Sequence, residues 1–303
     1  MFGLMYLPIL LALGLLIIGV VILVAVAATR GDRTPAGAEE RAVRGVRAIA
    51  LVAGVAAGAW VMFEPNPLDR GLGSSTVVAP LVLGIVVLLG VVCGELLVRP
   101  RYATDTRSAT MRPRHLRDHL PARVMRLVVA MTVAAVLLCT YTLITASTDD
   151  MGRAGRALIG WCSADLVATR GPYPGSFYVL PYLAGLAVAA AVAAGAGLLI
   201  SRRSLGAGPE AADRYRRTGL AAVVGAYGLT LAAPLAGIAF YAGTALLSHD
   251  CPQTGWRAVG VAALVLTVCA VGTALVSLVA LVAPSTVAAI DVPRKAEAEA
   301  VRG

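Results

Sequence analysis

Charged residues and histidines are scarce in this chain of 303 residues, and their scarcity excludes several classes of protein. Charged side chains make up 14% of the sequence, against roughly 25% in soluble domains. The three histidines lie outside the long apolar runs, which argues against a bis-histidine haem, a histidine metal site or a serine–histidine protease within a membrane. The single lysine, Lys295, is near the C-terminus, so no retinal Schiff base can form in an apolar segment.

Apolar residues dominate instead, at 58% of the chain, with a mean hydropathy of +0.81. A helix needs roughly 20 apolar residues to cross ~30 Å of hydrocarbon, and seven runs reach that length. We therefore predict an all-α, polytopic membrane protein in which residues 1–283 form one seven-helix domain and residues 284–303 form a tail. The predicted transmembrane helices are 5–28, 46–63, 76–98, 124–146, 177–200, 219–247 and 257–283.

Positive residues are divided unevenly between the two sets of loops. The loops 29–47, 99–126 and 201–217, together with the tail, hold 21 of the 26 positive residues. The positive-inside rule therefore predicts a cytoplasmic C-terminus and an N-terminus outside. We attribute the net charge of +9 to this topology and to attraction for anionic headgroups on the cytoplasmic side, and predict no nucleic-acid partner. The excess of arginine over lysine, with abundant alanine, is typical of a GC-rich bacterial genome and indicates a bacterial cytoplasmic membrane.

Aromatic residues and two cysteines indicate a folded cap on the outer side. Thirteen of the 16 aromatic residues fall in the outer loops or at the outer boundary, whereas an interfacial belt alone would occupy both sides. Cys162 and Cys251 lie in two different outer loops, on the oxidising side of the membrane. We predict a disulfide between them; the alternative is a pair of thiols whose backbones are too far apart.

Glu95 is the ionisable residue placed most deeply in a predicted helix, near its inner end. Arg99 follows four residues later, in the favourable Glu-to-Arg order, so we interpret the two as an intramembrane ion pair at the interface. A proton or coupling-ion site and an interhelical hydrogen bond are the alternatives, because intramembrane carboxylates are commonly functional.

Two glycine pairs have the spacing that lets helices approach closely. Gly54 and Gly58 lie in the second predicted helix, and Gly90 and Gly94 in the third. We expect these glycines to pack helices together within the chain, with homodimerisation as the alternative.

The sixth predicted helix carries a polar stripe along one face. At 100° per residue its members fall on one side of the helix, which points away from lipid. We interpret the stripe as a packing seam or as the lining of a solute cavity. It comprises Tyr227, Thr230, Pro234, Tyr241, Thr244 and Ser248.

His115 and His119 have a spacing that can ligate a metal from one helical face. Several arginines in residues 112–121 oppose a dication, so we predict no metal and interpret this segment as an amphipathic piece on the inner leaflet. A contact with a partner protein is the other alternative.

These patterns contain no acid–base pair, nucleophile or cofactor motif, so we predict that the protein is not an enzyme and needs no cofactor. The function that we expect is an accessory or interaction subunit of a membrane complex, contacting a membrane-protein partner. A permease or channel lined by the sixth helix is the main alternative; a ligand sensor and a lipid-modifying enzyme are less well supported.

Overall fold

A computed structural model of the chain describes residues 35–63, 73–97, 119–202 and 209–290. Six helices in this part of the chain are long and apolar enough to cross a membrane, so the protein is a mostly helical, multi-pass membrane protein. They are α2 (Pro35–Phe63), α3 (Ser75–Leu97), α4 (Ala122–Thr145), α5 (Ser176–Arg202), α6 (Pro209–Leu247) and α7 (Trp256–Val282). Each overlaps one of the last six predicted helices; the first predicted helix, 5–28, lies outside the described residues.

Two helices begin well before their apolar segments. The helix α2 begins at Pro35 and α6 at Pro209, whereas hydropathy predicts starts at residues 46 and 219. Alanine, glutamate and arginine fill these early turns, and all three are good helix formers in water. Hydropathy therefore locates the part of a helix that suits lipid, not the end of the helix itself. A short helix, α8 (Pro284–Ile290), likewise occupies the start of the predicted tail.

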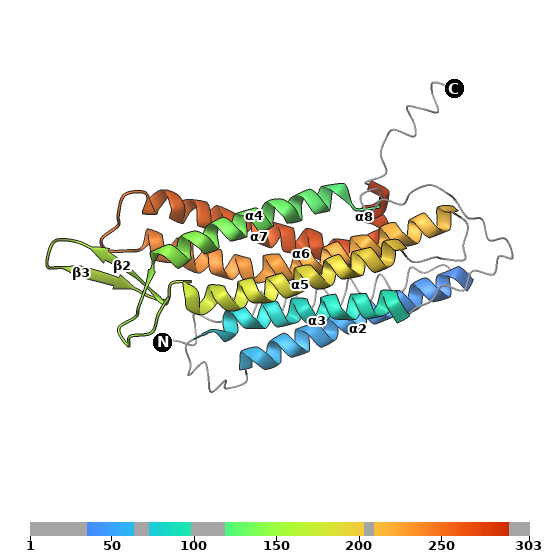
Figure 1. Ribbon diagram of the computed structural model, residues 1–303, viewed down its shortest axis with the longest axis horizontal. Coiled ribbons are helices and arrows are strands. Elements are labelled where there is room, and N and C mark those ends of the chain that lie inside the picture. Colours follow the sequence, from blue (N-terminus) through green and yellow to red (C-terminus); the bar gives the residue numbers. More distant parts are fainter. Residues whose placement is uncertain (1–34, 64–72, 98–118, 203–208, 291–303) are drawn as a thin grey trace, which may run out of the picture.

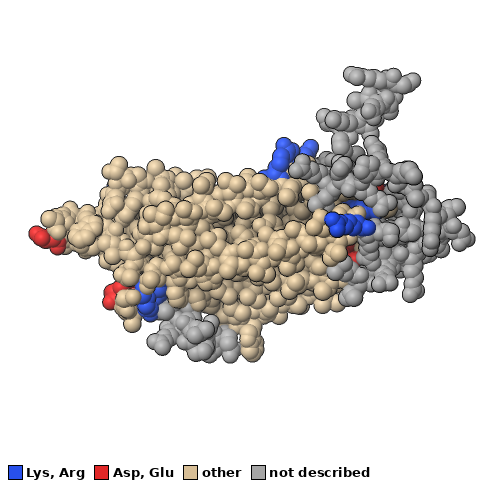
Figure 2. Space-filling model, in the orientation of Figure 1, with Lys and Arg blue, Asp and Glu red and all other residues tan. Residues whose placement is uncertain are grey.

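The helices run side by side in an elongated bundle, and their ends lie at its two opposite ends (Figure 1). The helix α6 is the central helix, since 67% of its apolar segment is buried against 28–44% in the other five. On the face shown in Figure 2, a broad band without charged side chains separates the two ends. This band has the surface expected of a protein in contact with lipid.

Reciprocal glycines join α2 to α3. A Cβ placed on Gly54 or Gly58 would lie 2.7 to 3.2 Å from α3 atoms, and Gly94 faces Val46 of α2 at 3.0 Å. Gly90 faces Ala50 even more closely. The predicted role of these glycines in packing within the chain is confirmed, because each pair lets the backbone of one helix approach the other.

One end of the bundle carries a small antiparallel sheet that the loop composition does not predict. Its strands are β1 (Ala146–Ser147), β2 (Ala157–Trp161) and β3 (Val167–Arg170), in the order β1-β2-β3. Strands of two to five residues are too short for an alternating pattern to stand out from a loop. We call this the sheet end, and the opposite end, where α4 and α6 begin, the arginine-rich end (Figure 1).

Candidate functional site at the sheet end

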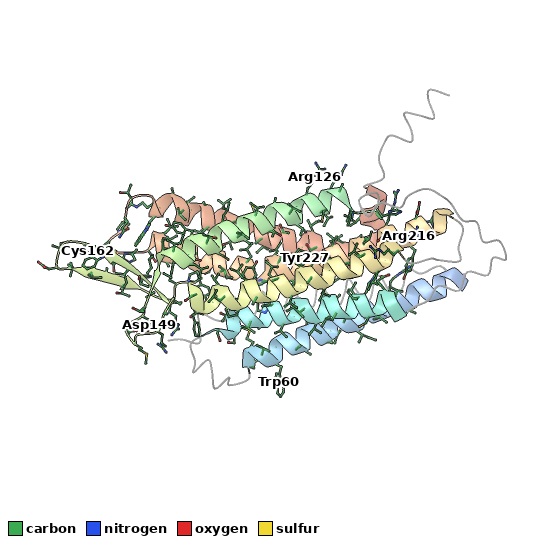
Figure 3. All side chains as sticks on the ribbon, in the orientation of Figure 1. Trp60, Arg126, Asp149, Cys162, Arg216 and Tyr227 are labelled. Atoms are coloured by element: carbon green, nitrogen blue, oxygen red, sulfur yellow. A yellow bond between two sulfur atoms is a disulfide. The ribbon has the colours of Figure 1, made fainter. Side chains whose placement is uncertain are left out.

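The sheet and two loops form a compact cap on the bundle, comprising residues 146–175 and 248–255 (Figure 1). Cys162 follows β2 and Cys251 lies between α6 and α7, and the structure places them at disulfide-bonding distance, as predicted. Their Cα atoms are 5.1 Å apart, although 89 positions separate them in the sequence. The link fixes the β2–β3 hairpin to the connection between α6 and α7 (Figure 3).

His249 lies beneath the hairpin, and each of its two ring nitrogens makes a hydrogen bond. Its Nδ1 accepts a hydrogen bond from the backbone N–H of Cys251 at 3.1 Å, so the ring proton belongs on Nε2. Nε2 then donates to the carbonyl oxygen of Leu158 in β2 at 3.3 Å. The ring also meets Trp256 edge to face, with centroids 4.9 Å apart. No sequence motif predicts this buried histidine, because the carbonyl group that its Nε2 contacts belongs to Leu158, 91 positions away in the sequence.

The glycine at position 160 makes room for this arrangement. A Cβ there would lie 2.5 Å from Cε1 of His249 and 2.7 Å from the carbonyl oxygen of Cys251. The strand can therefore rest on the α6–α7 connection only with glycine at this position.

A charged network closes the turn between β1 and β2. Asp149 accepts hydrogen bonds from the backbone N–H and Nε of Arg153, both at 2.8 Å, and from Nη1 of Arg156 at 3.1 Å. Desolvation by itself would raise the pKa of Asp149, but the hydrogen bonds and the charge of Arg153 outweigh it and lower that pKa below its usual value. Arg156 continues the network, donating to the hydroxyl of Tyr178 at 3.2 Å and lying 5.0 Å above the ring of Phe177.

Tyr173 anchors the other side of the cap. Its side chain is fully buried, and its hydroxyl lies 2.7 Å from Oγ1 of Thr145 at the end of α4. Burial raises the pKa of Tyr173 far above its usual range, so the phenol stays neutral. Together with the disulfide and the charged network, this contact joins the cap to α4, to α5 and to the connection between α6 and α7.

One face of the sheet remains open to solvent. The register pairs Trp161 with Val167 and Ile159 with Thr169, so these four residues share that face. The side chains of Trp161 and Val167 are 63% and 41% exposed, and Leu166 at the hairpin turn is 59% exposed. The cap thus presents large apolar side chains on a support that the disulfide cross-links, an arrangement suited to binding another protein.

The arginine-rich end contains a buried ion pair that joins α2 to α3. Nη2 of Arg47 donates to Oε1 of Glu95, with 8% and 1% of the two side chains exposed. Tyr215 of α6 donates to the backbone oxygen of Glu95 at 3.2 Å. The predicted partner Arg99 lies outside the described residues, so that pairing stays a prediction. Arg47 was missed because 48 positions separate it from Glu95, and only the packing of α2 on α3 brings them together.

Asp213, in the first turns of α6, contacts the side chains of His119 and Arg216. Its Oδ1 lies 3.1 Å from Nε2 of His119 and 3.2 Å from Nη1 of Arg216. His119 therefore contacts a carboxylate, while His115, its predicted companion, lies outside the described residues. Among the described residues, no group of three or more His, Cys, Asp or Glu side chains is placed to hold a metal.

The polar stripe of α6 is divided among different surroundings. Thr230 is fully buried at the crossing with α3, where a Cβ on Gly84 would lie 2.6 Å from its Cα. Tyr227, Tyr241 and Thr244 are half-buried, Pro234 is buried, and Ser248 is exposed. The hydroxyls of Thr230, Thr244 and Ser248 donate to carbonyls of their own helix at 2.6 to 3.2 Å.

A tyrosine from α5 supports the helix near Pro234. The hydroxyl of Tyr182 donates to the carbonyl oxygen of Leu231 at 3.0 Å, one turn before the proline. Proline has no N–H to continue the helical hydrogen bonds, so a side-chain donor at this level helps to satisfy the backbone in lipid. These contacts are those of a packed seam between α3, α5 and α6.

Comparison with known proteins adds no further assignment. No protein-family model matches the chain, and searches of curated proteins and of solved structures found no match.

Proposed function

We propose that the protein is a non-enzymatic accessory subunit of a membrane complex and that its cap contacts the partner protein. The observation that supports this best is the exposed apolar surface of Trp161, Leu166 and Val167 on a disulfide-linked hairpin. Large exposed apolar side chains on such an element are typical of protein-binding surfaces.

The position of the hairpin supports a partner other than lipid. Figure 1 shows β2 and β3 extending along the long axis of the bundle, past the ends of the helices. The apolar surface then lies beyond the hydrocarbon region, where lipid chains cannot cover it. The positive-inside rule predicts that the cap lies outside the cytoplasm, so we propose an extracytoplasmic contact in a bacterial cytoplasmic membrane.

The contacts of α6 favour this proposal over a permease. A solute cavity needs polar groups directed into it, yet the hydroxyls of Thr230, Thr244 and Ser248 donate to their own helix. We expect Thr230→Val and Tyr227→Phe to leave both folding and function nearly unchanged, since intramembrane hydrogen bonds average ~0.6 kcal/mol. A change of solute flux in proteoliposomes carrying either variant would support the permease instead.

The accessory role is tested by mild detergent extraction of the tagged full chain, followed by quantitative mass spectrometry. We expect a stoichiometric partner with the wild type and its loss with Trp161→Ser/Val167→Ser. Val265→Ala is a matched control, because Val265 is exposed on α7 within the lipid-facing region. The cap variant must keep its disulfide and its thermal unfolding temperature. A partner retained by the cap variant, or no stoichiometric partner with the wild type, contradicts the proposal.

A further inference from the structure

The strand β3 forms an open edge of the sheet in the cap. In the strand order β1-β2-β3 it pairs with β2 alone among the described strands. Ala168 is half-buried, and the other three residues of β3 are exposed. An edge strand of this kind presents a row of backbone N–H and C=O groups with which another extended chain can pair.

The register identifies the backbone groups of β3 that point to the open edge. The N–H of Cys162 donates to the carbonyl oxygen of Leu166 at 2.8 Å, so these two residues form a hydrogen-bonded pair. Bonded and non-bonded pairs alternate along an antiparallel ladder, so Ala168 is bonded to β2, whereas Val167 and Thr169 are not. The N–H and C=O groups of Val167 and Thr169 therefore point away from β2. Among the described residues, no backbone hydrogen bond outside the helices and strands involves them.

The chemistry of this edge fits an extended polypeptide. Each of the two outward residues offers one donor and one acceptor, and the backbone of another strand matches that alternation. The exposed side chain of Arg170 lies at the bundle end of β3, and the exposed Asp165 lies at the hairpin turn. The ion pairs between described residues involve neither of these side chains. An acidic side chain beside Arg170 would complement this edge.

A second copy of the chain in the same membrane fits this edge poorly. Figure 1 shows the hairpin extending along the long axis of the bundle, so two copies side by side would point their β3 strands in the same direction. Antiparallel pairing of the two β3 strands needs opposite directions, and the remaining parallel arrangement is the less stable one. The edge therefore favours a segment of a different protein.

We propose that a partner protein adds an extended segment to the outer edge of β3 and continues the sheet through Val167 and Thr169. Its apolar side chains would lie on the face of Trp161, and an acidic side chain would lie beside Arg170. Backbone hydrogen bonds supply affinity in this mode of binding, and alternate side chains supply specificity. The inference rests on the proposed function, because it names the way in which the partner of the cap binds.

The first experiment measures hydrogen–deuterium exchange at single amides of β3, by mass spectrometry with electron-transfer fragmentation. It compares the purified full chain with the complex obtained by mild detergent extraction. We expect the amides of Val167 and Thr169 to exchange rapidly in the purified chain and at least about tenfold more slowly in the complex. The amide of Ala168 is the internal control, because its bond to β2 should protect it in both samples.

The second experiment measures recovery of the partner with variants of the edge. Thr169→Pro removes an outward N–H and places a ring where the added strand would lie, in a position where an edge strand tolerates proline. Thr169→Val is the matched control, because it keeps the N–H. An acceptor left unpaired costs about 1–3 kcal/mol, so we expect Thr169→Pro to weaken binding about tenfold or more and Thr169→Val to retain it. Arg170→Glu should also weaken binding, because it would place two acidic side chains together.

Protection of both outward amides in the purified chain alone would overturn the proposal, because β3 would then already be paired, within one chain or between two copies. Unchanged exchange of these amides in the complex would also overturn it, as would equal partner recovery with Thr169→Pro and Thr169→Val. Wild-type recovery with Arg170→Glu would overturn the acidic contact. Thr169→Pro must keep the disulfide and the thermal unfolding temperature; if it does not, the exchange measurement decides, because it needs no variant.

The two proposals can fail separately. Loss of the partner with Trp161→Ser/Val167→Ser, together with unchanged exchange at Val167 and Thr169 in the wild-type complex, would overturn pairing at the edge and leave the accessory role intact. The absence of a stoichiometric partner with the wild type would overturn both.

Discussion

The buried pair of Arg47 and Glu95 allows a quantitative test of how α2 is held against α3. Both side chains are nearly removed from solvent, with 8% and 1% exposed, so each charge depends on compensation inside the protein. Removing one partner of a buried pair costs about 3–5 kcal/mol, whereas replacing both with apolar residues of similar volume is often neutral. We therefore expect Arg47→Met to lower the free energy of unfolding by about 3–5 kcal/mol.

The two single variants should differ, and the double variant should recover stability. A lone Arg47 can extend its long side chain towards the interface, so Glu95→Met should cost less than Arg47→Met. The double variant Arg47→Met/Glu95→Met should be clearly more stable than the sum of the single effects predicts. Such a double-mutant cycle isolates the coupling between the two side chains.

Unfolding can be followed by helical circular dichroism during titration of mixed micelles with sodium dodecyl sulfate. Arg99→Gln belongs in the same series, because the sequence alone favours Arg99 as the partner of Glu95. If Arg47 provides the main compensation, Arg99→Gln should change stability much less than Arg47→Met does. Additive single effects, or an Arg99→Gln cost equal to that of Arg47→Met, would refute the reasoning.

Three further predictions concern packing, the disulfide and pH. Gly90→Ala should destabilise the α2–α3 contact by about 1–3 kcal/mol in the same unfolding assay, whereas Gly195→Ala, which meets no atom within 4 Å, should be neutral or slightly stabilising. Removing the disulfide by Cys162→Ser or Cys251→Ser should cost roughly 4 kcal/mol, because it closes a long loop; the double variant should lose no more than either single one. The lowered pKa of Asp149 stabilises the folded cap above the ordinary aspartate pKa of about 3.8, and this stability is lost as the pH falls through the lower folded value. Asp149→Asn should remove that acid dependence from thermal unfolding, and an unchanged pH profile would contradict it.

Hydropathy located the described helices because every segment that crosses a membrane as a helix meets the same two conditions. It contains about 20 apolar residues, and its backbone groups form hydrogen bonds within the helix. The packing role of the glycine pairs of α2 and α3 was also predictable, since small residues four positions apart are typical of closely packed membrane helices. Hydropathy did not predict where α2 and α6 begin, because their first turns lie outside the apolar segments and depend on local helix propensity.

The candidate site was only partly predictable. The two cysteines lie in separate loops that the positive-inside rule predicts to be outside, and this indicated a disulfide, because free thiols in an oxidising compartment tend to pair. The contact of His249 with Leu158 and the close approach at Gly160 could not be predicted from the sequence, since each joins residues of two segments that are far apart in the chain. Helical periodicity predicts a polar stripe on one face of α6, but the hydroxyls of Thr230 and Thr244 donate to carbonyls of their own helix, a detail that periodicity cannot reveal.

The sequence by itself determined that this chain crosses a membrane several times, where most of its helices lie, and which two cysteines meet. These properties follow from the composition of short segments, because a run of apolar residues suffices to form a membrane helix, and cysteines exposed to an oxidising compartment suffice to form a disulfide. Only the tertiary structure decided that α6 is central, that Glu95 pairs with Arg47, and that the loop after α4 forms a sheet with an exposed apolar face. Those features depend on contacts between residues tens of positions apart, and such contacts are set by how whole helices pack rather than by any local pattern.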